Sequence, residues 1–209
     1  MLKMIKSIAF DCGNVLFSNA WNDEGTDPCF DIIPKILGIS KQKGNEIFFK
    51  HWSEIRIGKK NESILFKDLI ANSRRKISLK KLRRFYYNCI TKRDTFEIVE
   101  RLHKKYPNLP LYTLNDEGKE WMDIRIKKFK LRKYFKDFIT SGYVGYSKKE
   151  GKKIYEILLK RSGLKAGDFL FIDDRRMRLL TAKEIGFKTI LFKNKRQLRK
   201  DLKKHGIKL

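Results

Sequence analysis

The sequence has few of the residues that build disulfide frameworks and zinc clusters. Three cysteines occur among its 209 residues, and Cys12, Cys29 and Cys89 form no Cys-x-x-Cys pair. Its three histidines are isolated, without the spacing of metal ligands. Neither a disulfide scaffold nor a cysteine-ligated zinc centre is indicated. This cysteine usage favours a reducing, cytoplasmic setting.

Long apolar runs are absent as well. No stretch approaches the roughly 18 apolar residues that a membrane-spanning helix needs. The segment MLKMIKSIAFD is interrupted by Lys3 and Lys6 and reaches Asp11 too early for a secretory signal. We therefore expect no membrane segment. Hydrophobic residues make up 41% of the chain, which is enough for a packed core and excludes global disorder.

Acidic residues are scarce relative to basic ones. Fifty Lys and Arg against 24 Asp and Glu give a formal net charge of +26. The stretch Arg74–Arg93 holds nine basic residues and no acid, and residues 193–208 hold eight basic residues and one acid. Such runs favour either a polyanionic partner, with nucleic acid first, or the solvated faces of a generally basic composition.

Strand and helix patterns alternate along most of the chain. Short apolar runs predict strands at residues 5–10, 109–114, 137–142, 168–174 and 188–192. Helical spacing of apolar residues predicts helices at residues 95–105, 117–129, 151–162, 176–185 and 195–204. This alternation predicts an α/β fold with a Rossmann-like, mostly parallel sheet.

The pattern between the first two predicted strands is helical only. Apolar residues recur at helical spacing in four stripes, at residues 30–37, 47–52, 64–70 and 79–86. We therefore predict a small all-helical cap, residues 19–92, inserted after the first strand. The core would consist of residues 1–18 and 93–209, so the length of the chain fits one domain with an insertion.

Polar residues follow three of the predicted strands at the point where each strand ends. These residues are Asp11, the pair Asn115-Asp116 and the pair Asp173-Asp174. One carboxylate after a strand commonly caps a turn, but three such clusters meet at one edge of a parallel sheet, where ligands bind. Crowded carboxylates repel one another unless a cation holds them, so the pattern predicts a Mg²⁺ site.

Four segments of the sequence, taken in order along the chain, resemble the four motifs of the haloacid dehalogenase-like hydrolases. AFDCGNVL, LYTLND, GYSKKEGKKIY and FLFIDD occur in that order, and a helical insertion after the first motif is also typical of the family. The resemblance covers about residues 5–194. Its subgroup is the phosphatase type whose first motif reads D-x-G-N-V, related to the N-terminal domain of soluble epoxide hydrolases. It implies a Mg²⁺-dependent phosphomonoester hydrolase acting on a small phosphorylated anion.

The resemblance implies a nucleophile and a set of metal ligands. Asp11 would attack phosphorus and form an aspartyl-phosphate that water then hydrolyses. The metal would be held by Asp11, by the backbone carbonyl of Gly13 and by Asp174, with Asp173 as a less favoured ligand. Its charge would shield the phosphate so that an anionic nucleophile could approach.

Phosphate-binding groups are implied in the same way. Asn115 stands where the family usually has Ser or Thr, and its side-chain amide can donate a hydrogen bond to a phosphate oxygen. The backbone amides of Cys12, Gly13 and Asn14 would complete the phosphate cradle.

A lysine of the third motif would neutralise the phosphate and steady Asp11. Counting forward from Gly145 selects Lys148 for this role, and counting back from Tyr155 selects Lys149. We prefer Lys148 and keep Lys149 as the alternative.

Two departures from the family pattern bear on activity. Many family phosphatases carry a second aspartate two residues after the nucleophile as general acid, and here that residue is Gly13. A missing general acid costs about 10²–10⁴-fold in rate, so we expect slow or restricted turnover. The second departure is Lys149-Glu150-Gly151 in place of Lys-Pro-Asp.

Two other functions compete with this one. A non-catalytic module on the same fold could bind nucleic acid through its basic cap and tail. A hydrolytic dehalogenase could use the same aspartate, but such enzymes usually carry an aromatic residue at the position of Gly13 and need no metal.

Overall fold

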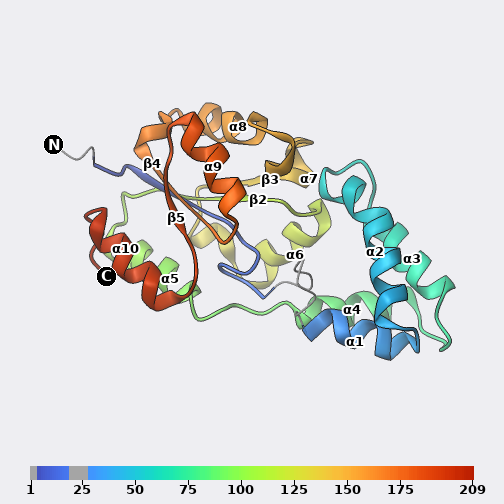
Figure 1. Cartoon of the computed structure of the whole chain (residues 1–209). Coiled ribbons are helices and arrows are strands. Elements are labelled where there is room, and N and C mark those ends of the chain that lie inside the picture. The colour runs from blue at the N-terminus through green and yellow to red at the C-terminus, as the bar shows by residue number, and fades with distance from the viewer. Residues whose placement is uncertain (1–3, 19–27) are drawn as a thin grey trace.

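A five-stranded parallel sheet forms the centre of the molecule in the computed structural model, which describes residues 4–18 and 28–209 (Figure 1). The strands lie in the order β3-β2-β1-β4-β5. Their bounds are β1 Ser7–Phe10, β2 Leu111–Asn115, β3 Asp137–Thr140, β4 Phe169–Asp173 and β5 Lys188–Leu191. Every residue of the central strands β1 and β4 is buried, which explains why apolar residues predominate in both.

Helices cover both faces of this sheet. They are α5 Phe96–Lys105, α6 Lys119–Lys128, α8 Lys153–Ser162, α9 Arg176–Ile185 and α10 Lys195–Lys204. Ile8 and Phe10 belong to a core shared with α5, α6 and α10, whereas Ala9 belongs to a core shared with α8 and α9. Successive residues of a strand point to opposite faces, so β1 serves both cores. The predicted α/β class is confirmed. Among the described residues, no helix combines the length and apolar character needed to cross a membrane.

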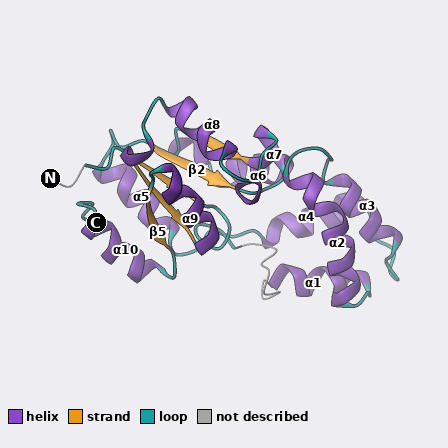
Figure 2. Cartoon of the chain, turned by 45° about the horizontal axis from the view of Figure 1, so that its top comes forward, coloured by secondary structure: helices purple, strands orange, loops and turns teal. Residues whose placement is uncertain are grey.

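Four helices between β1 and α5 lie together beyond one end of the sheet (Figure 2). They are α1 Pro28–Leu37, α2 Lys41–Arg56, α3 Ser63–Ala71 and α4 Leu79–Cys89, and we call them the helical insert. Ser40 and Ser78 cap α2 and α4 by accepting hydrogen bonds from backbone amides. The four predicted helices are confirmed. The division into core and cap stays a prediction, and its boundary at residue 19 lies outside the described residues.

The helical insert has its own apolar core. Phe48, Phe66 and Tyr86 are buried in it, and the only contribution to its buried set from the sheet side, within the described residues, is Trp121 of α6. Trp121 thus fixes the insert to the helix that follows β2.

The connections into and out of the helical insert pair with each other. The amide of Ser18 donates to the carbonyl of Thr91 at 2.9 Å, and the amide of Arg93 donates to the carbonyl of Leu16 at 2.9 Å. Phe17 and Lys92 form an antiparallel bridge between them. The insert therefore joins the core through two adjacent, hydrogen-bonded segments.

The end of α2 packs tightly against the core. A Cβ atom at Gly58 would lie 2.3 Å from the carbonyl oxygen of Gly142, so only glycine fits there. Ser141 donates through Oγ to the carbonyl of Arg56 at 2.6 Å. Residues 141 and 142 were predicted as the end of a strand, but they begin the short helix α7 Ser141–Val144. The strand ends early because its next residues turn to meet α2.

Candidate active site

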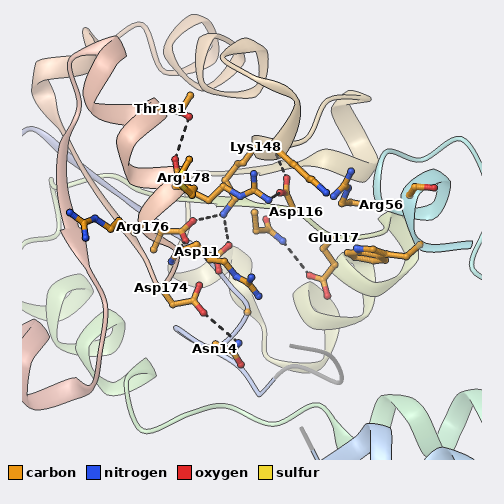
Figure 3. Close-up of a pocket in the computed structure, with 18 of the residues that line it drawn as sticks. Asp11, Asn14, Arg56, Asp116, Glu117, Lys148, Asp174, Arg176, Arg178 and Thr181 are labelled. Atoms are coloured by element: carbon orange, nitrogen blue, oxygen red, sulfur yellow. Dashed lines mark hydrogen bonds and ion pairs between the residues drawn. The ribbon is translucent and has the colours of Figure 1, made fainter. Parts of the chain in front are cut away.

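The carboxyl ends of β1, β2 and β4 open into one cavity of about 840 Å³. Asp11, Asn115, Asp173 and Asp174 all line it, as the sequence predicted from their places after strands. The helical insert supplies the opposite wall through α2. Figure 3 shows Arg56 reaching from that side toward Asp116 and Lys148.

Lys148 lies at the bottom of this cavity between two carboxylates. Its Nζ is 2.7 Å from Oδ1 of Asp11 and 2.6 Å from Oδ2 of Asp173 (Figure 3). The lysine side chain is 3% exposed, so the ion pairs are shielded from water. Lys149 is exposed and lines the cavity without reaching Asp11. Of the two predicted lysines, the structure brings Lys148 to the carboxylate.

The loop before Lys148 is held by Asp116. One carboxylate oxygen of Asp116 accepts a hydrogen bond from the backbone amide of Lys148 at 2.7 Å. The amide of Ser147 donates to Oε2 of Glu150 at 3.3 Å, and the amide of Glu150 donates to the carbonyl of Ser147 at 3.1 Å, in the same turn. The segment after β2 therefore orders the loop that supplies the buried ammonium group.

Electrostatics at the bottom of the cavity are unbalanced, because one ammonium group faces three carboxylates. Burial raises the pKa of Asp11 well above its ordinary value; Lys148 opposes this rise, and Asp173 and Asp174 add to it. Burial and the neighbouring Asp173 likewise raise the pKa of Asp174. Burial disfavours the charge of Lys148, but the carboxylates outweigh it and raise the lysine pKa.

The donor set of this cluster fits a hard divalent cation. One carboxylate oxygen from each of Asp11, Asp173 and Asp174 lies within 4.8 Å of the others. Both oxygens of Asp173 already accept hydrogen bonds, from Lys148 and from the amide of Arg175 at 2.8 Å. Asp174 accepts one long bond, 3.4 Å, from the side chain of Asn14. Asp174 is therefore freer to bind a metal than Asp173.

The loop after β1 folds back on itself beside Asp11. The amide of Phe17 donates to the carbonyl of Cys12 at 2.9 Å, and the amide of Asn14 donates to the carbonyl of Phe17 at 3.0 Å. This last bond uses a backbone amide that we predicted for the phosphate cradle. Within the ranges that the structure describes, the amides of Cys12 and Gly13 have no acceptor.

Cys12 and Asn115, both predicted to bind phosphate, make other contacts in the structure. Cys12 is 1% exposed and packs in the core, where burial raises the pKa of its thiol, and it does not line the cavity. Asn115 lines the cavity, but its Nδ2 donates to Glu117 at 3.2 Å, and its Oδ1 accepts from Thr140 at 3.0 Å. The carboxylate at one end and the hydroxyl at the other fix the amide orientation.

A buried ion pair stands beside Asn115, and the sequence patterns did not reveal it. Nε of Arg125 donates to both carboxylate oxygens of Glu117, at 2.7 and 2.9 Å, and Nη2 lies 2.6 Å from Oε1. Arg125 also lies over the ring of Phe17, 5.3 Å from its centroid. Glu117 comes just before α6 and Arg125 lies in the last turn of that helix, and their spacing of eight residues was the available signal.

Aromatic side chains of α2 form a second feature that the motifs did not indicate. Phe48, Trp52 and Arg56 are four residues apart, so they lie along one face of the helix, and all three line the cavity. The ring of Trp52 lies 5.3 Å from that of Phe48 and 5.4 Å from that of Trp121, at interplanar angles of 23° and 13°. These near-parallel rings make an apolar wall opposite the carboxylates.

Fold and site together define an α/β protein of the Rossmann-like class whose polar residues gather at the carboxyl edge of a parallel sheet. The family model of haloacid dehalogenase-like hydrolases matches residues 38–192. The chain therefore belongs to this family, as the motifs predicted. A comparison with curated proteins finds no match.

Solved structures of the same family share the fold. A HAD family enzyme from Bacteroides thetaiotaomicron, in complex with magnesium and inorganic phosphate, aligns with a TM-score of 0.73 at 20% identity over 90% of this chain and 94% of that one. A HAD phosphatase from Thermococcus onnurineus aligns at 0.65 and 20% identity over 98% and 99%. The L-2-haloacid dehalogenase from Xanthobacter autotrophicus aligns at 0.60 and 17% identity over 89% and 76%. At these identities the likeness concerns the fold.

Proposed function

We propose that this hydrolase is a Mg²⁺-dependent phosphomonoester hydrolase that works through an aspartyl-phosphate on Asp11. The observation that carries the proposal is the contact of Lys148 with Asp11 at the bottom of the cavity, 2.7 Å from Nζ to Oδ1. This contact orients the carboxylate and supplies positive charge where a phosphate would bind. Oδ2 of Asp11 accepts no hydrogen bond from the described part of the chain, so it is free to attack.

The chain's own residues account for the first chemical step. Lys148 holds Asp11 in place, and Oδ2 of Asp11 attacks phosphorus as the ester bond to the leaving group breaks. The free amides of Cys12 and Gly13 would bind phosphate oxygens. Asn115 would join them after releasing its hydrogen bond to Glu117.

Asp11, Asp174 and the carbonyl of Gly13 would hold the magnesium ion. When bound, the ion supplies positive charge that offsets the repulsion between the phosphate and the attacking carboxylate. A magnesium and phosphate complex of a structural neighbour from Bacteroides thetaiotaomicron supports this assignment.

The other two functions have less support. Nucleic-acid binding through the basic stretches stays a prediction, and no observation at the site favours it. Dehalogenation of this type needs no metal, whereas the cluster of Asp11, Asp173 and Asp174 suits a divalent cation. We therefore favour the phosphatase.

The decisive experiment measures inorganic phosphate released from a panel of phosphomonoesters with and without Mg²⁺. We expect release by the wild type with Mg²⁺ and a loss of at least about 10⁴-fold in Asp11→Asn, because the amide is not a nucleophile. Asp94→Asn, which changes an exposed carboxylate outside the cavity, is the matched control and should keep full activity. Equal release by Asp11→Asn, or none by the wild type, would contradict the proposal.

Thermal unfolding tests the metal site without turnover. We expect Mg²⁺ at about 100 times its dissociation constant to stabilise the wild type by about 2.7 kcal/mol. Asp174→Asn should remove most of this gain, and Asp94→Asn should keep it. A gain unchanged in Asp174→Asn would place the ion elsewhere.

A further inference from the structure

The cavity offers no carboxylic acid for the leaving group, within the described residues. Besides the three carboxylates of the metal cluster, its acidic residues there are Asp116 and Glu117. Asp116 accepts a hydrogen bond from the Lys148 amide and lies 3.5 Å from Nη2 of Arg178. Glu117 is held by Arg125 through both oxygens. A carboxylate that only accepts hydrogen bonds from cations and amides has no proton to give.

A site without a general acid favours leaving groups that depart as stable anions. An alkoxide is a poor leaving group unless it is protonated as the ester bond breaks, and the missing acid costs about 10²–10⁴-fold for such substrates. A phenolate spreads its charge into the ring and can leave without a proton. Because Gly13 and the hydrogen-bonded carboxylates supply no proton, the site favours esters whose leaving alcohol is acidic.

The wall opposite the carboxylates independently favours a flat ring. Trp52 is half-buried and lies within a group of near-parallel rings that line the cavity with Asp11. An aromatic ring stacks on such a surface, whereas a saturated chain gains only apolar contact. The cavity volume, about 840 Å³, is ample for an aromatic phosphate ester.

Arg56 gives this wall a polar end. Nη2 of Arg56 lies 3.2 Å from Oε1 of Glu150, and its Nε is buried with no hydrogen-bond acceptor in the described parts of the chain. The arginine lies one turn beyond Trp52 on the same face of α2. It can donate to an oxygen substituent of a ring stacked on Trp52.

We propose that the substrate is an aryl phosphate, an ester of a phenol-type hydroxyl whose ring stacks on Trp52. The inference rests on the proposed function and names its substrate class. Oδ2 of Asp11 bonds to phosphorus, and the bond from phosphorus to the phenolic oxygen breaks, so the phenolate leaves with the electron pair. Water then attacks the aspartyl-phosphate and releases inorganic phosphate and the carboxylate. The phenolate takes the proton of that water, so ester and water become phenol and phosphate.

Three substrates separate the ring from the acidity of the leaving group. Phenyl phosphate has both, hexafluoroisopropyl phosphate has an alcohol about as acidic as phenol but no ring, and benzyl phosphate has a ring on a weakly acidic alcohol. From phosphate release with Mg²⁺, we expect kcat/KM for phenyl phosphate to exceed that for the fluoroalkyl ester about fivefold to tenfold, through stacking. It should exceed that for benzyl phosphate at least about 100-fold, because no acid assists.

Trp52→Leu tests the wall itself. The variant should lower kcat/KM for phenyl phosphate about fivefold to tenfold more than it lowers kcat/KM for the fluoroalkyl ester. Phe85→Leu is the matched control, since Phe85 is a partly buried ring of the helical insert that does not line the cavity. Equal wild-type rates on the phenyl and fluoroalkyl esters would overturn ring recognition. Equal rates on the phenyl and benzyl esters would overturn the absence of a general acid.

Binding separates a failure of this inference from a failure of the proposed function. If no ester releases phosphate, hydrolysis is wrong, and calorimetry with phenylphosphonate and cyclohexylphosphonate in Mg²⁺ still tests the ring. Tighter binding of the phenyl compound, lost in Trp52→Leu, supports ring recognition without turnover. Equal binding of the two compounds overturns it.

Discussion

Two buried groups of charges, one lining the cavity and one beside it, differ in their balance of positive and negative charge. Lys148 faces Asp11, Asp173 and the nearby Asp174, so negative charge is in excess. Glu117 and Arg125, by contrast, form a one-to-one pair in which Nε and Nη2 of the arginine both contact the carboxylate. Burial disfavours the charge of Arg125, but Glu117 outweighs it and raises the arginine pKa.

The difference separates a group that awaits a further cation from one that is already complete. A balanced, bidentate pair satisfies both charges and supports the fold around it. A cluster with excess negative charge is unfavourable until a cation joins it, and such clusters are found at functional sites. Removing the basic side chain, Lys148 from one group or Arg125 from the other, should therefore have different consequences.

Of Lys148→Met and Arg125→Met, we expect Lys148→Met to have the larger effect on activity. We expect a loss on the order of 10³-fold in phosphate release with saturating Mg²⁺, because Asp11 loses its partner and the phosphate loses a buried positive charge. Lys149→Met changes the exposed neighbour and should cost less than about tenfold in the same measurement. A larger loss in Lys149→Met than in Lys148→Met would reverse the assignment.

Arg125→Met should have the larger effect on stability. Breaking a buried ion pair from one side leaves Glu117 uncompensated and costs about 3–5 kcal/mol of unfolding free energy, measured by urea denaturation. Replacing Glu117 by Gln in the same chain should recover part of this loss. Arg101→Met, at an exposed position, should stay within about 0.5 kcal/mol of the wild type. An Arg125→Met chain as stable as this control would show that the pair adds nothing.

A third group, in the helical insert, should show the smallest effect. Hydrogen bonds from Lys50 and His51 lower the pKa of Asp68. Because the pKa is lower in the folded chain, the resulting stability is present above the unfolded pKa and is lost as the pH falls through the folded value. Asp68→Asn should cost about 1 kcal/mol or less at neutral pH and nothing in strong acid, by urea denaturation at each pH. A difference that does not change with pH would contradict this.

Much of the fold follows from local sequence. The strand positions were predictable because β1 and β4 are buried on both faces, so all their residues except Ser7 and Asp173 are apolar. The bounds of α9 and α10 agree with the predicted ones, and α10 begins where the side chain of Asn194 caps it. The end of β3 was missed because contact with α2, remote in sequence, diverts the chain.

The residues of the site likewise fall into those that could be predicted from the sequence and those that could not. Asp11, Asn115 and Asp174 could be predicted because parallel strands bring their carboxyl ends together. Trp52 and Arg56 could not, since an amphipathic helix gives the same pattern whether its face covers a core or a cavity. The hydrogen bond from Asn115 to Glu117 and the bond from the Asn14 amide to Phe17 depend on side-chain and loop conformation that residue order leaves open.

The hydrogen bond between Ser18 and Thr91 has a consequence for how such a protein can vary in evolution. Paired antiparallel segments lie about 5 Å apart, so the core holds the ends of the helical insert as closely as it would hold a tight turn. A different helical module with adjacent ends could be exchanged at this junction while β1, β2 and β4 kept their register. On the proposed function, the residues for the reaction lie in the core and those that contact the leaving group lie in the insert, so one set could change while the other is kept.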